Sequence, residues 1–475
     1  MNLLKRPTTP LSKLVGFILT LAVSGFVLLI ASQQAAMAQP NLASATFFGG
    51  AGDQYGYGIA IQGNAIYVDG YYNGPVLRYA VPVLPGATPV WSNTLSGVQF
   101  YGVTTTASTV YAVGVGIPPA CGAVDGVGDT EGKSVWALYD SATGNFISCQ
   151  STNYFPYRGG ESLQGAVQTS SFFFAAGTAE TCGFGNNSFV LSKFDLNGVL
   201  LQAAVEVGET VGQTSCIGDS HASGLALFNG NLYVAGGSKL SGEDGVPRPV
   251  LLKYATDLTR QWKARPVDRI GNFTAAAGFS GAIYAVGSIQ ANGGDFLIEK
   301  YDEAGNRIWS QTSGGVGDDE LFGVVGIGTR VYAVGFTTSQ GSGGQDLVIL
   351  EIDPATGSTL STTLYGGALD DAAYGAATDG TDLYVVGASK SFASPAGNLV
   401  GQSDGVLLRY TVAVHLQCDI NNSGHVNVDD ISLIMAARGT LVAPGDPRDV
   451  DHDGIVTAND ARVCALKCDK PGCAR

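Results

Sequence analysis

Short apolar runs, separated by glycine, asparagine and aspartate, recur along most of the chain. One phrase returns throughout, combining apolar and aromatic residues and ending in glycine. Its seven copies begin 44 to 63 residues apart and read AIYVDG (65–70), TVYAVG (109–114), FFFAAG (172–177), NLYVAG (231–236), AIYAVG (282–287), RVYAVG (330–335) and DLYVVG (382–387). Such runs of β-branched and aromatic residues predict strands, and this period indicates a propeller, a solenoid or an array.

The neighbours of the phrase repeat as well. A glycine- and alanine-rich run such as YGYGIAIQGN precedes it, and two further runs joined by an Asp/Asn/Gly turn follow, as in DFLIEKYDEAGNRIW. This order predicts four strands per unit, with the small residues on the innermost strand, where the units crowd the axis. The predicted fold is therefore mainly β, a seven-bladed β-propeller over residues 41–413. A stack of open solenoid coils is the alternative architecture.

The two ends of the repeat region supply strands to the same unit. The last unit stops after its third strand, DGVLLRYTV (404–412). The early run ATFFGG (45–50) matches the fourth strands of other units, such as TTLYGG (362–367). We expect the N-terminal strand to complete the last blade, because closing the ring removes an open sheet edge.

Two stretches, KYDEAGNRIWSQTSGGVGDDELFGV and LYGGALDDAAYGAATDGTDLYVVG, resemble the secreted bacterial β-propeller repeat family known as SBBP. The shared features are a Gly-Gly-x-x-Asp-Asp turn, an inner strand and an Ile-Tyr-Val-x-Gly strand. The resemblance covers residues 41–412 and is weaker in the second to fourth units. It implies a propeller and brings no catalytic residues with it.

Acidic residues gather in the turns that lead from one unit to the next. Six of the seven turns contain them, namely Asp53, Glu161, Asp219, Asp268, Asp318 with Asp319, and Asp370 with Asp371. We expect these turns to share one face of the propeller. One interpretation is a ligand or cation site at the mouth of the axial channel. The other is that each carboxylate caps its own turn by accepting backbone amides.

The N-terminus has the features of a secretory signal peptide over residues 1–38. Lys5, Arg6 and Lys13 accompany an apolar run at 14–31, and small residues end at Ala38. We therefore expect a secreted or cell-surface protein. An uncleaved apolar segment that anchors the chain in a membrane is the alternative.

Charge narrows the range of partners. The formal net charge is −15, and removing the three cations of the signal changes it to −18. Such acidity disfavours nucleic acid and anionic membrane surfaces, so we expect neither nucleic acid nor, after signal cleavage, a membrane as partner. Bound Ca²⁺ and neutral polymers are compatible with it.

Eight cysteines follow the export signal, so disulfides are expected. The favoured local pairs are Cys121 with Cys149 and Cys182 with Cys216. Four more cysteines lie near the C-terminus and allow three connectivities: Cys418, Cys464, Cys468 and Cys473. No Cys-x-x-Cys pair occurs, which disfavours redox catalysis and zinc.

Motifs of catalysis are missing. The chain contains no His-Glu-x-x-His, no Gly-x-Ser-x-Gly and no aspartate box of the sialidase propellers. We therefore assign no catalytic residues and no organic cofactor. The carboxylate pairs of glycoside hydrolases are defined by their distance in space and not by sequence spacing, so an enzyme stays among the alternatives.

From Gln417 the composition changes, and two acidic segments lie thirty residues apart. They are DINNSGHVNVDD (419–430) and DVDHDGIVTAND (449–460). Both place oxygen-bearing side chains at loop positions 1, 3, 5, 9 and 12, with glycine at position 6. Ca²⁺ requires about six to eight oxygen ligands, and the loop folds around the ion only if position 6 accepts a left-handed conformation.

The spacing assigns ligands in each loop. In the first they are Asp419, Asn421, Ser423, the carbonyl of His425, and Asp430. In the second they are Asp449, Asp451, Asp453, the carbonyl of Ile455, and Asp460, with Thr457 acting through water. The ligand charges are −2 and −4, so we expect two Ca²⁺ sites of which the second is tighter.

An EF-hand has a helix before each loop, but the segment LVAPGDPR (441–448) contains two prolines and a glycine and cannot form one. Helices are expected after the loops instead. The first would place Ile431, Ile434 and Met435 on one apolar face, and the second would do so with Ala461, Cys464, Ala465 and Cys468. A bridge between Cys418 and Cys464 would then join the two halves.

Two loop-plus-helix halves with aspartate at position 12 resemble a type I dockerin over residues 417–468, followed by a tail at 469–475. The resemblance implies Ca²⁺-dependent folding and docking onto a cohesin-like protein. In that family, loop positions 10 and 11 take part in partner choice. Here they are Val428 with Asp429 and Ala458 with Asn459, in place of the family's Ser/Thr pairs.

These features favour an exported, non-catalytic binding or scaffold protein. One propeller face would be the recognition surface, for carbohydrate or a scaffold protein, and the dockerin-like module would dock onto a protein. The first alternative is a dockerin-tethered polysaccharide-degrading enzyme, a glycoside hydrolase or lyase, with its active site at the propeller channel. The second is that Ca²⁺ locks the module against its own propeller as a structural clip.

Overall fold

The computed structural model describes residues 40–474, apart from a set of short segments. These are 50–52, 72–73, 117–120, 122–131, 153–159, 181–186, 207–217, 241–245, 291–292, 393–402, 413–417, 422–424, 443–445, 452 and 469–470. The expected signal peptide, the pair Cys182–Cys216 and the proposed ligand Ser423 therefore lie outside the described residues. Among those described, no helix has the length and apolarity needed to cross a membrane.

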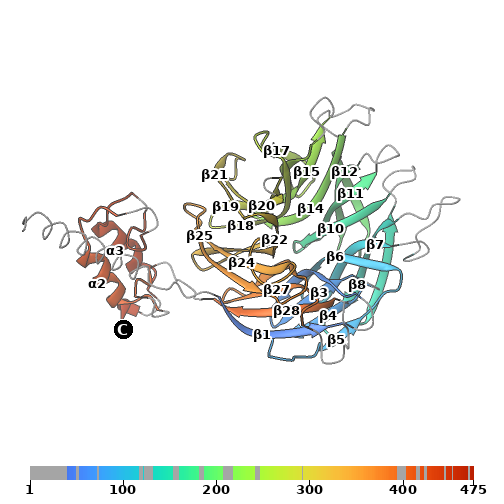
Figure 1. The fold of residues 1–475 in the computed structure, drawn as a ribbon, viewed down its shortest axis with the longest axis horizontal. Coiled ribbons are helices and arrows are strands. Elements are labelled where there is room, and N and C mark those ends of the chain that lie inside the picture. The colour runs from blue at the N-terminus through green and yellow to red at the C-terminus, as the bar shows by residue number, and fades with distance from the viewer. Residues whose placement is uncertain are drawn as a thin grey trace, which may run out of the picture. The chain divides into compact units, whose positions relative to one another are not determined.

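Antiparallel sheets of four strands follow one another along the chain (Figure 1). The first three are β2 (Gly56–Gln62), β3 (Ala65–Gly70), β4 (Val76–Ala80) and β5 (Trp91–Asn93); β6 (Val98–Thr105), β7 (Thr109–Gly116), β8 (Lys133–Asp140) and β9 (Phe146–Thr152); and β10 (Glu161–Gln168), β11 (Phe172–Glu180), β12 (Asn187–Asp195) and β13 (Leu200–Glu206). Each phrase of the sequence repeat forms the second strand of its sheet, as predicted.

The later sheets keep this order. They are β14 (Gly218–Phe228), β15 (Asn231–Leu240), β16 (Arg248–Ala255) and β17 (Arg260–Ala264); β18 (Gly271–Phe279), β19 (Ala282–Ile289), β20 (Gly293–Tyr301) and β21 (Arg307–Ser313); β22 (Gly317–Ile327), β23 (Arg330–Thr337), β24 (Asp346–Ile352) and β25 (Thr359–Tyr365); and β26 (Asp371–Thr378), β27 (Asp382–Ser389), β28 (Asp404–Thr411) and β1 (Asn41–Phe48). A short parallel pairing of β20 with β22 joins two of these sheets.

The sheets close into a ring. Strand β1 pairs antiparallel with β28, from Asn41 opposite Thr411 to Phe48 opposite Gly405, so the N-terminal strand completes the last sheet as predicted. The first strand of each sheet contacts the first strand of the next, and β26 contacts β2. Four-stranded sheets around one axis form a β-propeller (Figure 1). The open solenoid is wrong, because an open stack would leave β2 and β26 apart.

Small residues on the first strands let the sheets approach at the axis. At six glycines, an added Cβ atom would lie 3.0 Å or less from a backbone atom of the next first strand. They are Gly58, Gly102, Gly165, Gly224, Gly323 and Gly375. The glycine-rich runs of the sequence are thus explained by this close approach of neighbouring backbones.

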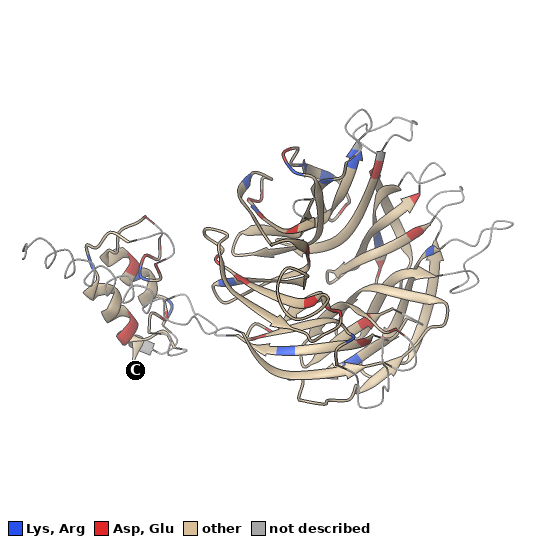
Figure 2. Ribbon diagram, in the orientation of Figure 1, with Lys and Arg blue, Asp and Glu red and all other residues tan. Residues whose placement is uncertain are grey.

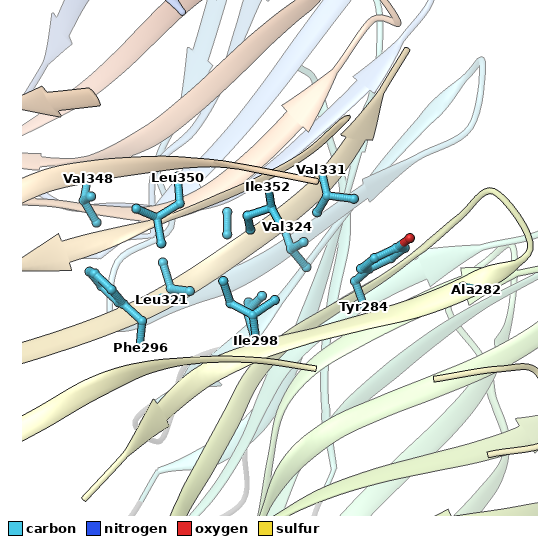
Figure 3. Packing of buried hydrophobic residues seen from close by; sticks show 12 residues of the cluster. Ala282, Tyr284, Phe296, Ile298, Leu321, Val324, Val331, Val348, Leu350 and Ile352 are labelled. Atoms are coloured by element: carbon cyan, nitrogen blue, oxygen red, sulfur yellow. The ribbon is translucent and has the colours of Figure 1, made fainter. Parts of the chain in front are cut away.

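Apolar side chains fill the space between neighbouring sheets. Between two of them, Tyr284, Phe296 and Ile298 pack against Leu321 and Leu350, all fully or almost fully buried (Figure 3). Burying one such side chain stabilises the fold by about 1.5–3 kcal/mol. The aromatic residue of each repeated phrase belongs to these cores, because all seven are buried: Tyr67, Tyr111, Phe174, Tyr233, Tyr284, Tyr332 and Tyr384.

Hydrogen bonds also cross between sheets at their outer turns. The indole of Trp136 donates to the carbonyl oxygen of Gly198 at 2.8 Å, and that of Trp309 donates to Pro354 at 3.2 Å. Lys300 reaches the same carbonyl of Pro354 at 2.8 Å. These two outer turns are therefore held by the preceding sheet.

The C-terminal segment forms a small helical module. It contains α2 (Val428–Ala436), α3 (Ala458–Ala465) and a single 3₁₀ turn, η2 (Pro471–Cys473). Asn427 caps α2 and Thr457 caps α3, each in a capping box with the aspartate three residues later. The module has its own apolar core around Ile434, Val456 and Cys464.

Disulfides occur in both the propeller and the C-terminal module. Cys121 pairs with Cys149 and Cys418 with Cys464, as predicted, and Cys468 pairs with Cys473. The predicted helix faces were partly wrong, because Met435 is 42% exposed and Ala465 is exposed. Two short helices that pack on each other through one narrow face cannot bury the adjoining positions.

Candidate metal centre

The second acidic loop is folded by its own carboxylates. Asp449 accepts backbone N–H bonds from Asp453 at 3.2 Å and from Gly454 at 2.9 Å. Gly454, at loop position 6, has φ +86°, the left-handed conformation that the spacing predicted. The chain therefore reverses direction around the oxygen atoms of the first half of the loop.

Three carboxylates of this loop converge on one point. One oxygen from each of Asp449, Asp451 and Asp453 lies within 4.8 Å of the other two. Oxygens that share one Ca²⁺ at about 2.3–2.6 Å from the ion are at most about 5 Å apart, so this spacing fits a single Ca²⁺. Asp449 is buried, while Asp451 and Asp453 are exposed. A cation between them would relieve the repulsion of three like charges.

Asp460, at position 12, ties the end of the loop to its start. One of its oxygens accepts the amides of Val450 at 2.6 Å and Asp451 at 3.2 Å, and the other accepts that of Thr457 at 2.7 Å. Burial acts to raise the pKa of Asp460, but these amide bonds outweigh it and lower the pKa. The buried side chain is thus held as a carboxylate, the form that binds metal.

The first loop repeats this closure. Asp430 is fully buried and accepts the amides of Ile420 at 2.8 Å, Asn421 at 3.1 Å and Asn427 at 2.9 Å. Asp419 is buried, whereas Asn421 and His425 are exposed. Of the predicted ligands in the described part of this loop, two are carboxylates, Asp419 and Asp430, whereas the second loop has four.

The backbone behind the second loop is fixed by short pairing. Val456 donates its N–H to Thr440 at 3.0 Å, and its carbonyl accepts from Gly439 at 2.8 Å. Ile455, the predicted carbonyl ligand, forms a bridge with Leu441. This segment after α2 thus supports the loop at positions 7 and 8.

In the propeller, where Figure 2 shows aspartate and glutamate in red, acidic turns cap themselves and brace the sheets. Asp319 accepts the amide of Gly315 at 3.1 Å and the hydroxyl of Ser339 at 2.7 Å, and it also accepts from Thr337. Asp371 accepts the amide of Gly367 at 3.0 Å in the equivalent turn. These bonds agree with the turn-capping interpretation.

The neighbouring aspartates bind the preceding sheet. Asp370 accepts the amide of Gln345 at 3.2 Å, just before β24, and Asp53 accepts that of Ser403 at 2.8 Å, just before β28. Asp370 also contacts Lys390 at 2.9 Å. The described acidic turns therefore form bonds within the protein. Among the described residues, their carboxylates do not come together in a group of three that could hold one metal ion.

One group of side chains was missed in the sequence, the tyrosines near the axis. Tyr55, Tyr57, Tyr71, Tyr101 and Tyr374 form a connected cluster of ring contacts. They come from three sheets, so no local motif joins them. The sequence did contain a signal for this cluster. The residue just before the glycine of the first strand is aromatic in some repeat units and polar in others.

No family model and no curated protein matches the chain. Solved structures of low similarity include a phage phi92 endosialidase, with 11% identity and TM-score 0.44 over 79% of this chain and 70% of that one. The WD40 β-propeller domain of Doa1 has 8% identity and TM-score 0.48, covering 79% and 97%. The Kuenenia stuttgartiensis hydrazine synthase has 9% identity and TM-score 0.48, covering 70% and 92%.

Proposed function

We propose that this chain is an exported, non-catalytic binding protein with a recognition propeller and a dockerin-like Ca²⁺ module at residues 417–468. The observation that carries the proposal is the convergence of Asp449, Asp451 and Asp453 within 4.8 Å in a loop closed by Asp460. The same closure by Asp430 in the first loop supports a duplicated site. Export is supported by the N-terminal sequence.

The propeller is proposed to have seven blades. The contacts of the first strands run in order from β2 through β6, β10, β14, β18 and β22 to β26 and return to β2. Each of these strands begins a group of four antiparallel strands, the last group including β1. A closed ring with loops on one face is a common form of recognition surface.

Calcium is proposed to bind at two sites. Asp449, Asp451, Asp453 and Asp460 would hold the ion in the second loop, and Asp419 and Asp430 would contribute in the first. When bound, the ion supplies charge neutralisation, which lets the acidic loops close. Four carboxylates attract the ion more strongly than two, so the second site is the tighter one.

Calorimetric titration of Ca²⁺ into the chelator-treated full chain tests these sites. Asp453→Asn should abolish the tighter phase, and Asp419→Asn the weaker one. Asp446→Asn is the matched control, because Asp446 lies just outside the second loop and pairs with Arg448 at 2.6 Å. Equal affinities, or a tighter first site, would contradict the proposed order.

The calcium-bound module is proposed to dock onto a cohesin-like protein. Its apolar exposed side chains support a protein partner, with Leu466 81% exposed and Leu441 82% exposed. Binding of the full chain to a type I cohesin, in Ca²⁺ and in EDTA, tests this. Calcium-dependent binding supports docking. If cohesin does not bind but Ca²⁺ slows proteolysis between residues 413 and 417, the module is instead a clip on its own propeller.

A further inference from the structure

A β-bulge recurs at the same place in every first strand of the propeller. The register shifts there between the first and second strands and leaves one residue unpaired, or two in β2. Around the ring the bulge residues are Tyr57 (beside Gly58), Tyr101, Gln164, Ser223, Thr274, Phe322 and Tyr374. All seven are half-buried. The propeller thus places one bulge side chain from each first strand around its axis.

The bulge residues on one side of the ring are aromatic and touch one another. The ring of Tyr57 lies 5.3 Å from that of Tyr101 and 5.0 Å from that of Tyr374, between centroids. Tyr374 lies 5.4 Å from Phe322. Strands β6 and β26 contact β2 from either side, so Tyr57 is the centre of an aromatic arc.

Two more tyrosines extend this arc towards the acidic turns. Tyr55, which precedes β2, lies 5.6 Å from Tyr71 and 6.2 Å from Tyr374, between ring centroids. A backbone bond of 3.0 Å from the Tyr71 amide to the Tyr55 carbonyl fixes the pair. The arc therefore reaches the face on which the acidic turns lie.

The other side of the ring has neutral polar residues at the same positions. Gln164, Ser223 and Thr274 are the bulge residues there. The residues two places earlier include Asn272, whose Oδ1 atom is buried without a hydrogen-bond partner, and His221. Burial lowers the pKa of His221, so its imidazole is neutral near pH 7.

The fold itself does not require tyrosine at the bulges. The sheets pack through the buried aromatic residues of the repeated phrase, and glutamine, serine and threonine form the bulges of three first strands equally well. An aromatic arc opposite amides and hydroxyls is an arrangement suited to a ligand with an apolar ring face and many hydroxyl groups. Sugar rings have this chemistry.

Two carboxylates near the arc already have partners within the protein. Asp370 pairs with Lys390 at 2.9 Å, and Glu320 accepts the hydroxyl of Ser288 at 3.2 Å. A quaternary ammonium ion would bind an aromatic cage with free carboxylates beside it. The neutral polar half of the ring favours an uncharged ligand instead.

We propose that the tyrosine arc and the polar residues across the axis form a binding site for a neutral oligosaccharide. The inference deepens the proposed function, since it names the ligand class of the recognition propeller. Tyr57 and Tyr374 would stack on the sugar ring, and the side-chain amide of Gln164, which donates to the Ser162 hydroxyl at 2.9 Å, would exchange this bond for one to a sugar hydroxyl.

The test measures ligand binding to the full chain by calorimetry and saturation-transfer NMR. The ligands are cellohexaose, xylohexaose and maltohexaose, with tetramethylammonium as the cationic probe. At least one hexaose should bind, and Tyr57→Ala should weaken it by about tenfold or more. Tyr57→Phe should keep most of the affinity. Phe146→Ala is the control, because Phe146 is an aromatic residue 49% exposed on the outer strand β9. If Tyr57→Ala does not fold, Gln164→Ala on the opposite side replaces it, with the same expected direction.

The proposal is overturned if no hexaose binds, if binding is unchanged in the folded Tyr57→Ala and Gln164→Ala variants, or if only tetramethylammonium binds in a Tyr57-dependent manner. Asp453→Asn separates this result from the calcium half of the proposed function. This variant should lose the tighter Ca²⁺ phase and bind the hexaose unchanged. Loss of calcium binding alone therefore leaves the sugar site standing, and loss of sugar binding alone leaves the calcium sites standing.

Discussion

A single residue, Asp69, departs from the repeated phrase. Its position holds alanine or valine in the other six copies. Asp69 is fully buried, its Oδ1 atom accepts the amide of Gly58 at 2.6 Å, and its Oδ2 atom has no hydrogen-bond partner. Burial raises the pKa of Asp69 to about 7, although the Gly58 amide opposes this rise. The departure is readable in the sequence, but its energetic consequence depends on burial that only the fold reveals.

Asp69 should make the propeller less stable as the pH rises. Its folded pKa, about 7, lies above the ordinary aspartate value of 3.8, so the folded state keeps a proton that the unfolded state releases. The free energy of unfolding therefore falls progressively between about pH 4 and 7. The total loss is at most about 4 kcal/mol and persists above pH 7. Asp69→Asn should remove this loss, stabilising the protein at pH 8 and changing little at pH 4.

Urea unfolding of the two proteins at both pH values, in excess Ca²⁺, measures the difference. All four tryptophans lie in the propeller, at positions 91, 136, 262 and 309, so their fluorescence reports on this domain alone. The same stability difference at pH 4 and pH 8 would mean that Asp69 does not carry the proton.

At the scale of elements, the two adjacent carboxylates of the Gly-Gly-x-x-Asp-Asp turn have different roles. At the start of β22, Asp318 is exposed, whereas Asp319 is buried and accepts three hydrogen bonds. The pattern predicted a turn, and the turn-capping interpretation agrees with these bonds. It did not reveal that the second aspartate also binds the end of β23 through Thr337 and Ser339.

The two aspartates of this turn should therefore differ sharply in their effect on stability. Asp319→Ala leaves a buried amide and two hydroxyls without their acceptor, which should cost about 2–4 kcal/mol. Asp318→Ala removes an exposed side chain and should change stability by about 0.5 kcal/mol or less. Urea unfolding detected by tryptophan fluorescence compares the two variants. Equal losses of stability would show that the hydrogen bonds of Asp319 do not distinguish it from Asp318.

Elements were predicted well where one unit repeats another, and poorly where the outcome depends on neighbours. The phrase around Tyr284 and its flanks predicted β19, β20 and β21, because alternation and turn residues are local. The contacts of Tyr57 with Tyr101 and Tyr374 join residues from three sheets, which no single unit encodes. The metal loop lies between these cases. Its spacing predicted the left-handed Gly454 and the acidic cluster, but the support from Thr440 is not visible in the pattern.

At the scale of the molecule, closure of the ring rests on one N-terminal strand. Strand β1 covers the edge of β28, and Phe48 packs with Ile66, Tyr79 and Leu407 in the core next to it. Thr46 is buried, and Ser44 donates its hydroxyl to the Val83 carbonyl at 2.7 Å, beyond β4 of the next sheet. The strand therefore joins the two ends of the repeat region and also fixes the contact between the last sheet and the first.

Removing residues 40–48 should open the ring and leave the edge of β28 unpaired. An exposed edge strand promotes association with other chains, so the truncated protein should have a lower unfolding temperature and a strong tendency to oligomerise. A synthetic peptide of residues 40–49 should restore both properties by adding the missing strand. In the same peptide, proline in place of Thr46, whose backbone pairs with Leu407, should prevent rescue because it cannot donate the ladder bond. Thermal unfolding and light scattering measure both effects, and a monomeric truncated chain as stable as the full one would show that closure does not depend on β1.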